Sequence, residues 1–180
     1  AVLLGLNRLY EAGLDTDELC RLGCRIGADV PFCVKRGISS VRGIGERFKD
    51  CTRLPGCKIL IACAGEHIST PWAYKRLDEL FDYKRRGAAI GHFTERLEGG
   101  NIRRSSEGLY NIFEAAVLPI RDGARRLKET MLDGGALGAI MSGSGPSVFG
   151  IFDNLRDAEK VWRRLCDDGV TAFICEPYYE

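Results

Sequence analysis

The sequence predicts an α+β fold whose larger domain is a ferredoxin-like, split βαβ sheet with additional helices. Two observations lead to this prediction. From residue 57 onward, short apolar runs alternate with segments of helical periodicity, in the order strand, several helices, strand, strand, helix, strand. The pair Pro55-Gly56 is a turn signal that separates this region from a glycine-punctuated N-terminal region. We therefore predict two domains, at residues 1–54 and 55–180.

The N-terminal domain is expected to start with two helices, over residues 1–12 and 15–26. Asp15 or Thr16 can cap the second helix, and Glu18 can complete a capping box with the cap residue. After the helices, the sequence indicates a compact turn and two short β-like segments bounded by glycine. The turn is predicted at 28–32, and the β-like segments at 38–42 and 46–48.

The second domain opens with a strongly apolar run, CKILIACA at 57–64, which predicts a central strand. A helix is predicted from Ser69 or Thr70 to about residue 81, because Pro71 falls in its first turn, where proline fits best. The same patterns predict the remaining elements. These are helices at 87–98, 106–117, 119–133 and 154–168, and strands at 136–142, 147–152 and 171–175.

The composition is that of an ordinary globular protein, with 180 residues, 45% hydrophobic and 28% charged, and a formal net charge of +1. Such a small charge argues against nucleic acid or an anionic membrane surface as the main partner. No apolar run approaches the length of a membrane span. The eight cysteines form no C-x-x-C pair and lie mostly in apolar runs, which indicates reduced thiols and a cytoplasmic protein. No metal site is predicted.

A loop of small residues, Ser142-Gly143-Ser144-Gly145-Pro146, lies between two predicted strands. Its first four residues offer consecutive backbone N–H groups with little side-chain bulk, so they can curl into an anion-binding concavity. Pro146 has no N–H and ends this run of donors. The alternative interpretation of the same residues is a tight Gly/Ser hairpin turn.

Three segments of the chain form a recognisable series when they are taken in order. They are GADVPF at 27–32, STPWAY at 69–74 and MSGSGP at 141–146, with a G-x-G-E stretch at 43–46. Together they resemble the GHMP small-molecule kinases over nearly the whole chain. The resemblance is closest to the branch of the family that acts on a methylerythritol linked to cytidine diphosphate.

The resemblance implies a GHMP-kinase C-terminal domain of ferredoxin-like fold, together with a remnant of the family's S5-like N-terminal domain. It also implies ATP-dependent phosphorylation of the 2-hydroxyl of the CDP-linked methylerythritol, a step of non-mevalonate isoprenoid and terpenoid synthesis. Mg²⁺ is expected beside ATP. The implied partner is therefore a small molecule, with neither nucleic acid nor a membrane involved.

Carried onto this sequence, the resemblance also assigns roles to individual residues. Asp29 would act as a base on the attacking hydroxyl or orient it, the alternative being an ordinary turn residue. Tyr74 would stack on the cytosine, the alternative being a core residue of its helix. Thr70 and Pro71 would shape the cytidine pocket. The nucleotide phosphates would be contacted by backbone N–H groups of Gly143, Ser144 and Gly145. Weaker candidates for the same contact are Ser142 and Ser147.

In this family a glycine-rich ATP loop directly precedes the helix with which the sequence begins, and that loop is absent from the sequence. The resemblance therefore implies a fragment that does not phosphorylate the substrate alone. Two other functions stay open. One is a different GHMP kinase for a small alcohol such as homoserine or mevalonate, against which GADVPF argues. The other is a non-catalytic ferredoxin-like module that binds a ligand or RNA, and the near-neutral charge argues against RNA.

Overall fold

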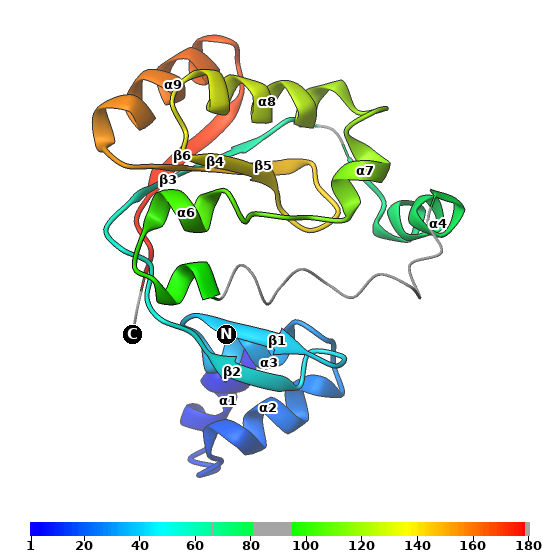
Figure 1. Ribbon diagram of the computed structural model, residues 1–180. Coiled ribbons are helices and arrows are strands. Elements are labelled where there is room, and N and C mark those ends of the chain that lie inside the picture. The colour runs from blue at the N-terminus through cyan, green and yellow to red at the C-terminus, as the bar shows by residue number, and fades with distance from the viewer. Residues whose placement is uncertain (66, 81–94, 179–180) are drawn as a thin grey trace. The chain divides into compact units, whose positions relative to one another are not determined.

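The computed structural model describes residues 1–65, 67–80 and 95–178, which fall into two units (Figure 1). The first unit comprises Ala1–Arg53 with Tyr178, and the second comprises Leu54–Pro177. Within the described ranges, no helix has the length and apolarity needed to cross a membrane.

The first unit contains three short helices and a two-stranded antiparallel hairpin. The helices are α1 (Val2–Leu9), α2 (Thr16–Cys24) and α3 (Val30–Lys35), and the hairpin strands are β1 (Ser39–Arg42) and β2 (Arg47–Asp50).

Helix α2 begins where the capping signal predicts. The Asp15 carboxylate accepts the Glu18 backbone N–H at 2.8 Å, and the Glu18 carboxylate accepts the Asp15 backbone N–H at 2.9 Å. The capping box is therefore complete. Helix α2 then packs against α3 at Gly23, where a Cβ would lie 3.0 Å from Val30 Cγ1.

The compact turn predicted at 28–32 is wrong in its second half, because α3 begins at Val30. Pro31 lies buried in the first turn of this helix. There its fixed φ favours the helical backbone, and its missing N–H is one that the helix does not use. Asp29 consequently occupies the position directly before a helix.

The second unit is built on a four-stranded antiparallel sheet with the strand order β4-β5-β3-β6. The central strand β3 (Lys58–Cys63) pairs with β5 (Ser147–Phe152) on one side and with β6 (Thr171–Cys175) on the other. Strand β4 (Gly138–Met141) pairs with β5 and forms one edge of the described sheet. This strand order is that of a split βαβ sheet, so the predicted ferredoxin-like fold is confirmed.

Helices α8 (Asp122–Asp133) and α9 (Leu155–Asp167) cover one face of this sheet (Figure 1). The hydrophobic core lies between the two helices and the sheet. Leu60 and Ala62 of β3 belong to this core, whereas Ile61 between them is on the opposite face and is 39% exposed. The core thus holds the central strand β3 in place beside the β4–β5 hairpin.

The single helix predicted over 106–117 is wrong. Helix α6 (Ile102–Ser106) ends where the predicted helix begins, residues 107–112 are not helical, and only α7 (Phe113–Val117) lies within the predicted range. The physical reason is a turn before α7, because the Asn111 side-chain oxygen accepts the backbone N–H of Phe113, two residues on, at 3.0 Å. Asn111 lies one residue before Ile112, the N-cap of α7, whose side chain makes no capping hydrogen bond. A side-chain bond of this kind favours a turn over a continuing helix.

The other helices of the second unit agree with prediction to within a few residues. Helix α4 (Thr70–Leu80) begins at Thr70. Helix α8 begins three residues later than predicted, at Asp122 and not at 119. The helix predicted over 87–98 lies largely outside the described residues.

Candidate functional site

The Ser142–Pro146 loop closes the β4–β5 hairpin as a tight turn. The Ser142 N–H donates to the Ser147 carbonyl at 2.8 Å, and the Gly145 N–H donates to the Ser142 carbonyl at 2.9 Å. Gly143 has φ +55°, as a type II′ turn requires at its first central position. Two of the four N–H groups expected to face an anion are therefore bonded inside the hairpin. The N–H groups of Gly143 and Ser144 have no acceptor among the described residues.

Gly145 is required by both its backbone conformation and its surroundings. Its φ is +83°, which favours glycine. A Cβ at this position would also lie 2.6 Å from Met141 Sδ and 3.1 Å from Ile68 Cδ1. The loop can therefore lie directly against the buried Met141 side chain only because residue 145 has no side chain.

A hydrogen bond joins this loop to the start of α4. Thr70 Oγ1 and Ser144 Oγ lie 2.9 Å apart, and either hydroxyl can donate. The two residues are 74 positions apart in the sequence, so the fold brings two of the three sequence motifs together. Pro71 follows Thr70 in the first turn of α4 and is exposed.

Tyr74 lies on α4, and 56% of it is exposed. Its ring meets that of Phe113 edge to face, with ring centroids 5.0 Å apart and an interplanar angle of 84°. The alternative that Tyr74 is a core residue is therefore wrong. The contact with Phe113 restrains a ring that otherwise borders solvent.

Two side chains that the sequence did not single out hold the beginning of the loop. The Asn111 amide nitrogen donates to the Met141 carbonyl at 2.6 Å and to the Gly143 carbonyl at 2.8 Å. Glu114 Oε1 accepts the Met141 N–H at 2.9 Å. The spacing N-x-x-E was the available signal, since it is a capping-box pattern at a helix start, but the helix predicted over 106–117 runs through it.

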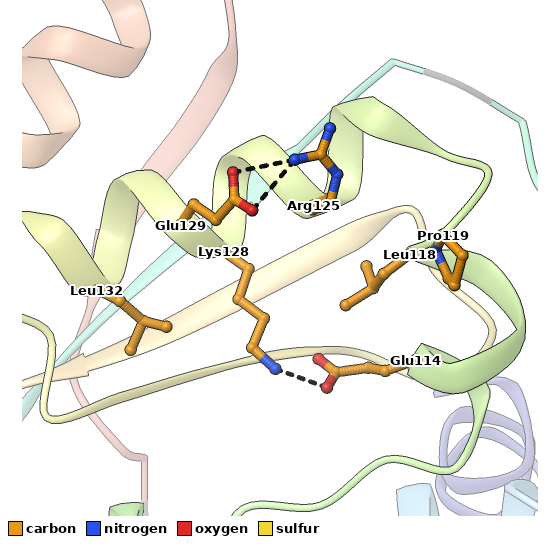
Figure 2. A pocket seen from close by; sticks show the side chains of 7 residues that line it. All are labelled: Glu114, Leu118, Pro119, Arg125, Lys128, Glu129 and Leu132. Carbon is orange, nitrogen blue, oxygen red and sulfur yellow. Dashed lines mark hydrogen bonds and ion pairs between the residues drawn. The ribbon is translucent and has the colours of Figure 1, made fainter.

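Figure 2 shows how Glu114 is itself held in place. Its carboxylate accepts a hydrogen bond from Lys128 Nζ of α8 at 2.6 Å. These two residues line a hollow of about 380 Å³ between α7 and α8, with Leu118 and Leu132 among its apolar residues. The hollow also contains Arg125, whose guanidinium bonds Glu129. Its charged side chains are thus paired with one another.

Asp29 belongs to the first unit, where it directly precedes α3. Its side chain makes no capping hydrogen bond, and the residue is exposed. Among the described residues, its carboxylate has no hydrogen-bond or ion-pair partner. The turn at 43–46 packs against this region, because a Cβ at Gly45 would lie only 2.0 Å from the Ala28 carbonyl oxygen. GADVPF and the G-x-G-E stretch therefore form one local structure.

Glu46 closes the turn at 43–46. Its carboxylate accepts the Ile44 backbone N–H at 2.6 Å and a hydrogen bond from Arg47 Nε at 3.2 Å. The N–H groups of Glu46 itself and of Ile44 hold the pKa of the Glu46 carboxyl below its ordinary value, because they stabilise the charged form. The turn is thus tied together by a carboxylate.

Among the described residues, no group of three or more His, Cys, Asp or Glu side chains is placed to hold a metal ion.

Comparison with known proteins shows which family the chain matches. The family described as GHMP kinases C terminal matches residues 74–171, more than half of the chain. The 4-diphosphocytidyl-2-C-methyl-D-erythritol kinase of Caldicellulosiruptor saccharolyticus is 41% identical over 165 residues, which cover 92% of this chain and 56% of that protein. The kinase of the same name from Gloeobacter violaceus is 37% identical over 180 residues, covering 98% of this chain and 60% of its own length.

Solved structures agree with this family. A crystal structure of 4-(cytidine 5'-diphospho)-2C-methyl-D-erythritol kinase matches with a TM-score of 0.73 at 28% identity, covering 97% of this chain and 61% of that one. The Streptococcus pneumoniae phosphomevalonate kinase has a TM-score of 0.74 at 16% identity, and the match covers 96% of this chain and 66% of that one. The second likeness concerns the fold alone. The chain spans little more than half the length of the curated relatives it matches.

The Glu46 carboxyl provides a pH-dependent test of the turn at 43–46. A pKa held below the ordinary value of 4.5 contributes stability at higher pH, and this contribution is lost as the pH falls through the lowered pKa. We expect the Ile44 amide resonance, followed by NMR in the 180-residue chain, to titrate with a midpoint below 4.5.

Arg47→Gln is the matched control for this titration. Arg47 lowers the pKa of Glu46 less than the two backbone N–H groups do, so the midpoint should move only slightly. A midpoint at or above 4.5 in the unchanged chain would contradict the assigned hydrogen bonds.

Proposed function

The chain belongs to the GHMP kinase family, and on that premise we propose that it forms part of a kinase for a CDP-linked methylerythritol. Such a kinase transfers the γ-phosphoryl group of ATP to the 2-hydroxyl of 4-diphosphocytidyl-2-C-methyl-D-erythritol. The names of the relatives at 36–41% identity support this substrate. The observation that carries the proposal is the Thr70–Ser144 hydrogen bond, because it brings the small-residue loop and the T-P-W-A-Y segment into contact.

The loop is suited to hold phosphate oxygens. The Gly143 and Ser144 N–H groups have no acceptor among the described residues, and both lie at the tip of a hairpin that is fixed at its base. Backbone N–H groups and a serine hydroxyl donate to phosphate without adding a formal charge of their own. When bound, ATP supplies the phosphoryl group that is transferred. Gly145 contributes shape, since its own N–H is bonded to Ser142.

Asp29 is suited to take the proton of the attacking hydroxyl. As the new P–O bond forms, the O–H bond of the alcohol breaks, and the P–O bond to the bridging oxygen breaks to release ADP. A carboxylate that is exposed and not engaged in capping its helix can accept that proton. The role of Asp29 is inferred from this chemistry and from the GADVPF motif.

Tyr74 is suited to recognise the cytidine end of the substrate. An exposed aromatic ring offers a face for base stacking, which contributes roughly 1–3 kcal/mol per base. Phe113 restrains this ring before the substrate arrives, so less side-chain freedom is lost on binding. Thr70 and Pro71 lie at the start of the same helix.

Kinases of this family take ATP as the phosphate donor, usually with Mg²⁺. Mg²⁺ beside a nucleotide is held by the phosphate oxygens and one or two carboxylates, and its ligands in this chain are not assigned.

The substrate proposal is tested with a fusion kinase. The full 180-residue chain is joined to the part of the Caldicellulosiruptor saccharolyticus kinase that lies outside the matched region. We expect kcat/KM for CDP-methylerythritol to exceed that for homoserine or mevalonate by at least about 100-fold, because only the first substrate has a base for Tyr74. ADP release measures the rate.

The control for this test is the same fusion in which the relative's own matched segment takes the place of the 180-residue chain. A fusion kinase that prefers homoserine or mevalonate would favour the other GHMP activities. If the fusion kinase is inactive on every alcohol while the control is active, the proposed function is wrong.

Asp29→Asn in the fusion kinase tests the proposed base. The change is isosteric but removes the proton acceptor, so we expect kcat to fall by about 100-fold or more with little change in the KM for CDP-methylerythritol. Asp17→Asn is the matched control, since Asp17 is an exposed aspartate in the first turn of α2. Near-normal turnover of Asp29→Asn would refute the assignment.

A further inference from the structure

We propose that Asn111 is a positioning residue for the phosphate-binding loop, an inference that rests on the proposed function. In this role its side chain orients a backbone N–H group of the loop and does not itself contact ATP or the alcohol substrate. Its amide donates to the carbonyls of Met141 and Gly143, at 2.6 and 2.8 Å. Both amide protons are thereby used, one on each side of Ser142.

The bond to Gly143 has a geometric consequence for its neighbour. The Gly143 carbonyl and the Ser144 N–H belong to the same peptide group, which is planar and trans. In such a group the C=O and N–H bonds point in opposite directions. Because Asn111 holds the Gly143 carbonyl toward itself, the Ser144 N–H is directed away from Asn111. The Ser144 N–H group, which we propose donates to a phosphate oxygen, is therefore oriented by a side chain from outside the hairpin.

The bond to Met141 fixes the point at which the loop leaves the sheet. Met141 is the last residue of β4, an edge strand of the described sheet, so its outward backbone groups have no strand partner there. Asn111 bonds its carbonyl and Glu114 bonds its N–H. Glu114 is in turn held by Lys128 (Figure 2). These contacts fix the residue that precedes the loop.

The oxygen of the Asn111 side chain has a separate function. It accepts the Phe113 backbone N–H at 3.0 Å and so closes the turn that directly precedes α7. This separation allows the two functions to be tested independently, because a substitution can keep the acceptor and remove the donors. Ionised aspartate does this fully, and serine keeps an oxygen but has one O–H donor on a shorter side chain in place of the two amide donors.

The first experiment uses the 180-residue chain without ligand. Asn111→Asp retains an oxygen for Phe113 but loses both donors to the loop. We expect ¹⁵N relaxation to show the Gly143 and Ser144 amides becoming more mobile, with unchanged resonances for β3. Asn101→Asp is the matched control, because Asn101 caps α6 through its oxygen and aspartate caps as well. Unchanged mobility at Gly143 and Ser144 would overturn the proposal.

The second experiment measures kinetics in the fusion kinase. For Asn111→Asp we expect the KM for ATP to rise on the order of tenfold and kcat to fall, with an unchanged KM for CDP-methylerythritol. A purely structural defect would reduce the active fraction and leave both KM values alone. Asn111→Ser keeps an oxygen for Phe113 but cannot bond both loop carbonyls with its single O–H, so it should change the KM for ATP in the same direction, and it replaces Asn111→Asp if that variant does not fold.

The outcomes separate the inference from the proposed function. If the unchanged fusion kinase is active and both Asn111 variants keep its KM for ATP, the positioning role is wrong and the function stands. If the unchanged fusion kinase is inactive while its control is active, the proposed function fails and the inference fails with it.

Discussion

The candidate site depends on how the backbone of Met141 is held at the edge of the sheet. An edge strand leaves N–H and C=O groups without a strand partner, and these groups need other partners when they are buried. Met141 is buried, and Asn111 and Glu114 from the start of α7 supply those partners. The loop that follows Met141 is therefore shaped by α7 as well as by its own sequence.

The start of α7 also connects the two sides of the site. Phe113 lies between Asn111 and Glu114 in the sequence and meets the Tyr74 ring of α4. Ser144 of the loop and Thr70 of α4 complete the connection from the other direction. A displacement of α7 would therefore disturb the loop and the exposed tyrosine together. This linkage gives a physical reason for two distant motifs to act as one site.

Much of the fold could be predicted from local pattern. The apolar runs at 57–64 and 147–152 predict strands that the sheet contains, and the Asp15–Glu18 capping box predicts where α2 begins. The helix predicted over 106–117 fails because a polar residue serves the backbone of a distant segment. Asn111 forms the turn before α7 and holds the loop, and periodicity carries no sign of the contact with the loop.

The candidate site could be predicted only in part for the same reason. The glycines and serines of the loop predict a run of N–H groups that could face an anion. The sequence cannot show that the Ser142 and Gly145 N–H groups are bonded within the hairpin. That follows from the register of β4 against β5, in which Met141 pairs with Val148. The exposure of Tyr74 likewise depends on where α4 packs, which the spacing of apolar residues did not determine.

The central claim is that the small-residue loop and the start of α4 form one site, and a double-mutant cycle tests it most directly. Thr70→Val and Ser144→Ala each remove one hydroxyl, singly and together, and urea unfolding of the 180-residue chain is followed by tryptophan fluorescence, since Trp72 and Trp162 both lie in the second unit. The account predicts a coupling free energy of about 0.5 kcal/mol or more between the two positions. A coupling free energy of zero would contradict it.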